Sequence, residues 1–133
     1  MVVLVIPSQY FDRFWISLKP NPNPGCSWPT DHKANCAYVQ EVAKEIEYFK
    51  DKVGIETTVS FYREIFGIDG CDLSKYPLIY RNDDQSPNFD DYKPFGGWDA
   101  PYGKVFQENV SLCDLTLNKV YEKEFQEPSL LSE

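Results

Sequence analysis

The alternation of short apolar segments with an amphipathic helix limits the fold of this chain more than any other feature. The large apolar side chains within residues 11–19 predict a buried strand, and the proline-rich segment 20–25 then enforces a loop. A helix is expected from about Lys33 to Lys52, with Asp31 or Asn35 available as its N-cap. Its apolar face recurs at steps of three and four residues, at Val39, Val42, Ile46, Phe49 and Val53.

The alternation of strand and helix repeats once more and is then followed by consecutive strands. Residues 53–56 are suited to a short strand, and a second helix follows with Thr57 or Thr58 as its cap and Gly67 at its end. The remaining strand candidates have little helix between them and cover residues 77–81, 104–106 and 115–120. Strand and helix alternation that gives way to consecutive strands predicts an α/β domain.

Composition and charge limit the partners that the chain could bind. Its 133 residues are 42% hydrophobic, which is enough for one domain with a core. The net charge of -8 disfavours phosphate backbones and anionic membranes, so we expect neither a nucleic-acid nor a membrane partner. The apolar run at residues 2–6 is too short for a signal segment or a membrane span, and we expect a buried strand there.

Four cysteines stand at positions 26, 36, 71 and 113. Their spacing contains no CxxC pair, so we expect no metal site, and no cofactor motif is present in the sequence. Cys26 and Cys36 bracket a short loop and are the favoured disulfide, which would leave Cys71 to pair with Cys113. Free thiols are the alternative if the protein is cytosolic.

The triplet Asn109-Val-Ser111 is an N-glycosylation sequon and, like two disulfides, would suit a secreted protein. The start of the chain, however, shows no basic region of the kind that begins a secretion signal. One resolution is that the natural protein begins upstream of Met1.

Three stretches of the chain, in their order and spacing, resemble the glycoside hydrolase family 25 lysozymes, most closely those of the animal and protist type. The first is Phe14-Trp-Ile-Ser-Leu-Lys-Pro-Asn21, which is similar to the family's Trp-x-Asp-x-Glu strand and precedes a cysteine-bracketed loop. The second, residues 53–67, is similar to a family strand and the helix after it. The third, residues 77–121, contains the Pro-Leu-Ile-Tyr strand and the Phe-Gly-Gly-Trp turn.

The resemblance implies a partial, incomplete TIM-like β/α barrel, with the active site at the carboxyl ends of the strands. A closed barrel generally needs about 200 residues or more. We therefore expect the first barrel strands, and one family acid near the start, to be absent. Residues 1–125 would form a partial lysozyme-like domain and residues 126–133 a flexible tail. A protein partner could cover the open side of such a barrel.

Glycoside hydrolysis needs two carboxyl groups that flank the scissile bond, and a strand delivers both when they stand two residues apart. Ser17 and Lys19 occupy the two family acid positions on that strand. In the last strand Asn118 stands where the resemblance implies a third acid, unless the register is shifted so that Asp114 takes that place. A serine hydroxyl and an amide have no titratable proton at neutral pH, and a lysine ammonium cannot stabilise a developing cation, so we expect hydrolysis to be lost.

Tyr80, Trp98 and Tyr102 are candidates for stacking on sugar rings, although buried aromatic side chains are commoner than sugar platforms. The aspartates of residues 83–99 are expected to be solvated loop residues. His32 has no second histidine to act with and is expected at the surface.

The favoured hypothesis is a lysozyme-like protein related to bacterial cell-wall (peptidoglycan) hydrolysis that is a pseudoenzyme or fragment, extracellular or lysosomal by resemblance. The alternative is a non-catalytic module that binds a glycan or a protein. A third hypothesis is a non-functional product of a broken gene.

Overall fold

A computed structural model describes residues 13–49 and 52–122, and the interpretations given for residues 1–12 and 123–133 lie outside this part of the chain. The described elements follow one another as strands β1 (Phe14–Ser17), β2 (Val53–Glu56), β3 (Leu78–Arg81), β4 (Gly103–Leu112) and β5 (Leu115–Glu122), with helix α1 (His32–Tyr48) after β1 and helix α2 (Val59–Phe66) after β2.

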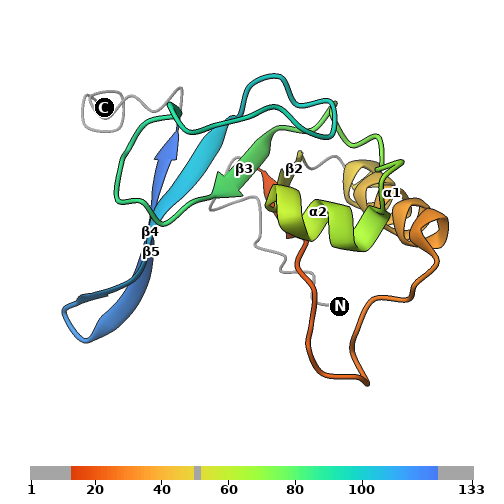
Figure 1. Ribbon diagram of the computed structural model, residues 1–133, viewed down its shortest axis with the longest axis horizontal. Coiled ribbons are helices and arrows are strands. Elements are labelled where there is room, and N and C mark those ends of the chain that lie inside the picture. The colour runs from red at the N-terminus through yellow and green to blue at the C-terminus, as the bar shows by residue number, and fades with distance from the viewer. Residues whose placement is uncertain (1–12, 50–51, 123–133) are drawn as a thin grey trace.

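The five strands form one sheet in sequence order, and this curled sheet is half of a barrel (Figure 1). Neighbouring strands from β1 to β4 run parallel, and β5 returns antiparallel to β4. The far end of the β4–β5 hairpin extends away from the two helices (Figure 1). The predicted α/β class and partial barrel are therefore confirmed.

The helix boundaries follow from local capping chemistry. The Asp31 carboxylate accepts a hydrogen bond from the Ala34 N–H at 3.1 Å, and the Thr58 hydroxyl accepts one from the Phe61 N–H at 3.1 Å. Gly67 ends α2 with a φ of 72°, which a residue without a Cβ adopts at little cost. Of the two cap candidates for each helix, Asp31 and Thr58 are confirmed.

Asn35, the other candidate cap of α1, has a different role. Its side-chain amide is buried and donates at 2.9 Å to the carbonyls of both Pro29 and Ile65, so it links α1 to the end of α2.

The core lies between the helices and one face of the sheet. Val39 and Ala43 from α1 pack with strand residues such as Ile16 and Ile55, and α2 adds Ile65 and other apolar side chains. The predicted apolar face of α1 was too long, because the helix ends at Tyr48. As a result Phe49 is 71% exposed and Val53 belongs to β2.

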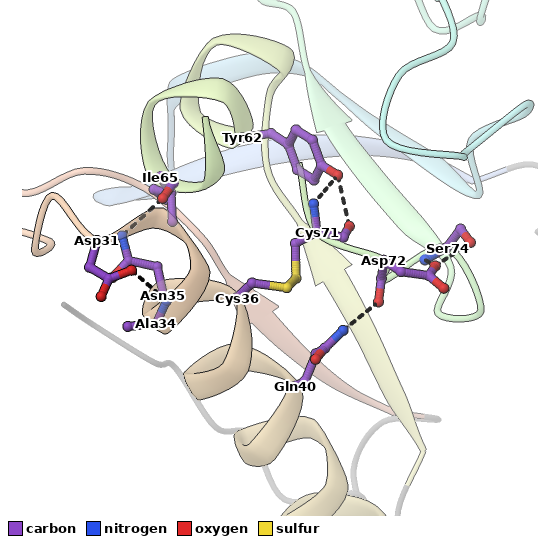
Figure 2. Close-up of a disulfide and its surroundings, with 10 residues drawn as sticks. All are labelled: Asp31, Ala34, Asn35, Cys36, Gln40, Tyr62, Ile65, Cys71, Asp72 and Ser74. Carbon is purple, nitrogen blue, oxygen red and sulfur yellow. Dashed lines mark hydrogen bonds between the residues drawn. A yellow bond between two sulfur atoms is a disulfide. The ribbon is translucent and has the colours of Figure 1, made fainter. Parts of the chain in front are cut away.

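The disulfide pairing predicted from the sequence was wrong. Cys36 bonds Cys71, with Cα atoms 5.4 Å apart, so the bridge ties α1 to the segment after α2 (Figure 2). Neither the Cys26–Cys36 nor the Cys71–Cys113 pair forms, because α1 carries Cys36 to Cys71 across the core. Cys113 is an exposed free thiol in the turn between β4 and β5.

The Tyr62 hydroxyl fixes the loop end of the bridge. It accepts from the Cys71 N–H and donates to the Cys71 carbonyl, both at 2.7 Å (Figure 2). A cross-link that closes a loop of 35 residues stabilises a fold by roughly 2–4 kcal/mol.

Candidate functional site

A cleft of about 400 Å³ lies at the carboxyl ends of the parallel strands, where barrel proteins hold their ligands. We call it the strand-end cleft. Its lining includes Ser17 at the end of β1 and Lys19 just beyond it, Glu56 at the end of β2, Arg81 at the end of β3, Asp83 in the loop after β3 and Glu108 in β4.

The alternation of β1 decides which of its side chains reach this cleft. Phe14 and Ile16 are buried, whereas Trp15 and Ser17 lie on the other face, and Lys19 continues that face two residues beyond Ser17. Ser17 is paired in register with Glu56, the last residue of β2. The two predicted acid positions of this strand therefore do line a cleft, and the residues there are a serine and a lysine.

Just beyond β1 the backbone is held in place by β2 and the residue that follows it. The Leu18 N–H donates to the Glu56 carbonyl at 2.9 Å, and the Thr57 hydroxyl donates to the Leu18 carbonyl at 2.8 Å. These bonds extend the register past the end of β1, so the direction of Lys19 into the cleft is set by the sheet.

The guanidinium of Arg81 joins two carboxylates of the cleft wall. Its Nη2 lies 3.0 Å from Oε2 of Glu56, and its Nη1 lies 2.6 Å from Oε1 of Glu108. Sequence analysis missed this trio, which we call the Arg81 bridge. Arg81 is 25 residues from Glu56 and 27 residues from Glu108 in the sequence, so only the strand register brings the three together. The one sequence signal was that Glu56 and Arg81 both follow buried strand residues.

The Arg81 bridge bears on the chemistry of the cleft. A glycosidase needs one carboxyl that donates a proton and another that faces the sugar carbon. Glu56 and Glu108 instead both accept hydrogen bonds from one permanent cation. Lys19 adds a second cation to the same cleft.

Asn118 lies on exposed β5 and is not among the residues that line the strand-end cleft. Its side-chain oxygen accepts a hydrogen bond from the backbone N–H of Asn109 at 3.1 Å. Glu108 and Asn109 both oppose Asn118 because the β4–β5 register shifts between Gln107 and Val110. Asp114, the alternative acid, sits in the hairpin turn with a φ of 64°.

The three aromatic candidates for sugar stacking occupy different environments. Trp98 is 3% exposed and donates its indole N–H to the Tyr76 carbonyl at 2.8 Å, so it belongs to the core and offers no open face. Tyr102 is half-buried, with its ring centroid 5.6 Å from that of Trp15. Tyr80 lines a smaller cavity of about 220 Å³ that shares Thr58, Arg81 and Asn82 with the strand-end cleft. That cavity is also lined by the half-buried rings of Tyr92 and Phe95.

Two of the loop aspartates that were expected to be only solvated also pair with one buried ammonium. The side chain of Lys104 is fully buried, and its Nζ lies 2.8 Å from carboxylate oxygens of both Asp84 and Asp91. It also donates at 3.1 Å to the carbonyls of Ser86 and Asn88. We call this group the Lys104 cluster, and it folds the loop after β3 around one ammonium.

Hydrogen bonding decides the charge states within the Lys104 cluster. Burial would lower the pKa of Lys104, but its bonds to Asp84 and Asp91 outweigh burial and raise that pKa above its ordinary value. Burial would raise the pKa of Asp91, but hydrogen bonds from Lys104, Asn82 and Tyr80 outweigh it and lower that pKa to about 2. Burial and the hydrogen bond that it donates to Asp91 raise the pKa of the Tyr80 phenol.

Within residues 13–49 and 52–122, no group of three or more histidine, cysteine or acidic side chains is placed to hold a metal ion. None of the helices in the same ranges is long and apolar enough to cross a bilayer.

A parallel half-barrel with a polar cleft at its strand ends defines a member of the β/α-barrel class. A family model described as lysozyme-like protein 1 matches residues 6–106. The chain therefore belongs to the lysozyme-like family, whose relatives include proteins named for glycoside hydrolase family 25.

Three relatives illustrate the match. A protein of Dictyostelium discoideum named probable GH family 25 lysozyme 5 is 32% identical over 83% of this chain and 50% of its own length. Lysozyme-like protein 5 of Caenorhabditis elegans is 32% identical over 56% of this chain and 35% of its own length. Counting factor 50 of Dictyostelium discoideum is 29% identical over 81% of this chain and 35% of its own length. The chain thus spans about half or less of the length of these relatives, and no solved structure gives a comparable match.

Proposed function

We propose that the strand-end cleft binds a glycan of the bacterial cell-wall type without hydrolysing it. The observation that carries this proposal is the composition of the cleft: Ser17 and Lys19, which the resemblance assigns to the family's acid positions, line it, and its two glutamates are paired with Arg81.

The absence of hydrolysis follows from the charges at the cleft. The transition state of glycoside hydrolysis resembles an oxocarbenium ion and is stabilised by a nearby anion. Lys19 presents a cation just beyond β1, and the carboxylates of Glu56 and Glu108 are already paired with Arg81. Asp83 also lines the cleft, but one carboxyl cannot supply both the acid and the second carboxylate that hydrolysis needs. Two like charges at about 4 Å and an effective dielectric constant near 20 repel by about 4 kcal/mol, which is roughly a thousandfold in rate.

Binding is supported by the same lining. Hydroxyl and amide groups from Ser17, Thr58 and Asn82 can exchange hydrogen bonds with sugar hydroxyls, and Phe61 adds an aromatic side chain to the lining. Cell-wall glycans carry free carboxylates on their peptide stems and on those lactyl groups to which no stem is attached. Lys19 makes no ion pair with any of the described residues, so its ammonium is available to such a carboxylate.

The test is co-sedimentation of the purified chain with insoluble peptidoglycan, together with turbidity clearing of the same suspension. We expect the wild-type chain to sediment with the glycan and to leave the turbidity unchanged. Lys19→Glu should weaken binding about tenfold, equivalent to about 1.4 kcal/mol, because it repels carboxylates.

The matched control is Lys33→Glu, which makes the same charge change at an exposed position of α1 outside the cleft. It should bind as the wild type does, within about twofold. Equal binding by the two variants would contradict binding at the strand-end cleft. Turbidity clearing by the wild-type chain would refute the absence of hydrolysis.

An extracellular or lysosomal location accords with this function. The Cys36–Cys71 disulfide is typical of proteins from oxidising compartments, and several relatives are named as lysozymes.

A protein partner is the second candidate, and the β4–β5 hairpin favours it. Leu115 is 60% exposed, and Leu117 and Val120 of the same strand are also exposed. An arm with this much open apolar surface is typical of a protein contact. Such a partner would be detected as a specific complex that Leu115→Ser and Leu117→Ser together abolish while glycan sedimentation is kept.

A further inference from the structure

The β-bulge in the β4–β5 hairpin carries the one N-glycosylation sequon of the 133-residue sequence. Asn109, Val110 and Ser111 provide the acceptor amide, a central residue other than proline, and the hydroxyl that the sequon requires. A sequon alone is a frequent chance pattern, so the structural setting of Asn109 decides whether it can be used.

The bulge turns Asn109 outward. Glu108 and Asn109 together oppose Asn118 on β5, and Asn109 has a φ of 56°. This left-handed backbone is one that asparagine tolerates better than most residues. Bulges redirect side chains in this way, and here Glu108 points to Arg81 in the cleft while Asn109 is exposed.

The hydrogen bonds of the bulge leave the acceptor amide available. The backbone N–H of Asn109 donates to the side chain of Asn118, whereas no hydrogen bond of the Asn109 side chain occurs with any described residue. Ser111 is exposed as well, and it is paired with Thr116 across the hairpin. A glycan on the Asn109 amide nitrogen would therefore break no described contact.

The two faces of the hairpin differ in polarity at this point. Val110 pairs with Leu117 on one face, and Ser111 pairs with Thr116 on the opposite face. The hydroxyl of the sequon thus belongs to the polar face, away from the exposed leucines.

We propose that Asn109 is an N-linked glycosylation site of this protein. In the reaction, the amide nitrogen of Asn109 forms a bond to the anomeric carbon of an oligosaccharide supplied by a lipid-pyrophosphate-linked donor. The bond between that carbon and the donor's pyrophosphate oxygen breaks, the lipid pyrophosphate leaves with the electron pair, and the amide loses one proton to a base of the transferring enzyme. No oxidant or reductant is required.

The Cys36–Cys71 disulfide supports this inference independently of the sequon. Its formation needs an oxidising compartment, and N-linked glycans are added to chains that enter such a compartment. The inference does not depend on glycan binding in the strand-end cleft, because Asn109 is not among the residues that line it.

The test uses the complete chain behind a cleavable secretion leader in eukaryotic cells, with intact mass measured before and after peptide-N-glycosidase treatment. Wild type and Ser111→Thr should carry a glycan whose mass is lost on treatment, with conversion of Asn109 to aspartate. Ser111→Ala should have the bare polypeptide mass, since it removes only the sequon hydroxyl. The two Ser111 variants are preferred to Asn109→Gln, because glutamine at a φ of 56° would also strain the bulge.

Translation of the same three chains with microsomes makes the result independent of folding and secretion, because protease protection shows which molecules have crossed the membrane. Unmodified wild-type chain among the protected molecules would overturn the proposal. A glycan retained by Ser111→Ala would also overturn it.

Discussion

Within residues 13–49 and 52–122, two clusters place one cation between two carboxylates, and the two cations differ in their access to solvent. In the Lys104 cluster the cation is fully buried and is enclosed by carboxylate and carbonyl oxygens of one loop. In the Arg81 bridge the cation is 25% exposed and faces a cleft. Similar ionic groups can thus occupy two settings: the buried cation holds a loop together, and the open one forms part of the wall of a cleft.

The largest expected effect is a loss of stability when the buried cation of the Lys104 cluster is removed. Lys104→Met leaves two partly exposed carboxylates and the carbonyls of Ser86 and Asn88 without their buried donor, and we expect the free energy of unfolding to fall by roughly 2–3 kcal/mol. Urea denaturation measures it. Lys44→Met, at an exposed position of α1, is the control and should cost under about 0.5 kcal/mol. A cost for Lys104→Met as small as that of the control would show that the cluster has no structural role.

Acid should weaken the same cluster at a defined pH. The pKa of Asp91 is lowered from 3.8 to about 2 in the folded chain, so ionised Asp91 stabilises the fold fully above about pH 4. That contribution, roughly 2 kcal/mol, is lost as the pH falls through about 2. The difference in unfolding free energy between wild type and Asp91→Asn should therefore shrink from pH 5 to pH 2. A constant difference would contradict the lowered pKa.

The Arg81 bridge should contribute less to stability. We expect Arg81→Met to reduce the free energy of unfolding by about 1 kcal/mol, because the guanidinium itself is partly exposed to water, unlike the Lys104 ammonium. Its larger effect should be on peptidoglycan sedimentation, since two unpaired carboxylates would then repel an anionic glycan. If Arg81→Met destabilised the chain as much as Lys104→Met, the distinction between the two clusters would fail.

The smallest effect is expected at Asn118. An aspartate there keeps the oxygen that accepts from the Asn109 N–H, so Asn118→Asp should change stability by under about 0.5 kcal/mol. It should also give no turbidity clearing, because Asn118 is outside the lining of the cleft. Measurable clearing by this variant would mean that β5 reaches the reacting sugar.

Local signals in the sequence predicted much of the scaffold. The caps Asp31 and Thr58 and the helix end at Gly67 depend on neighbouring residues only, and all three are confirmed. The position of Ser17 and Lys19 on one face of a strand followed from the period of two.

Features that depend on distant contacts could not be predicted in this way. The Cys36–Cys71 bridge depends on how α1 packs, and the Arg81 bridge depends on the register of three strands. Lys104 was expected only as a strand residue, because nothing local indicates that a loop will enclose its ammonium. Trp98 was a sugar-stacking candidate because a sequence does not reveal which aromatic side chains the core encloses.

The most direct test of the central claim, that the strand-end cleft lacks a working acid pair, is the release of reducing sugar ends from purified peptidoglycan between pH 4 and pH 8. We expect the wild-type chain, Glu56→Gln and Glu108→Gln all to release no more than a blank without protein. Release by the wild-type chain that either glutamine variant abolishes would contradict the account, because it would identify one of the two glutamates paired with Arg81 as a catalytic residue.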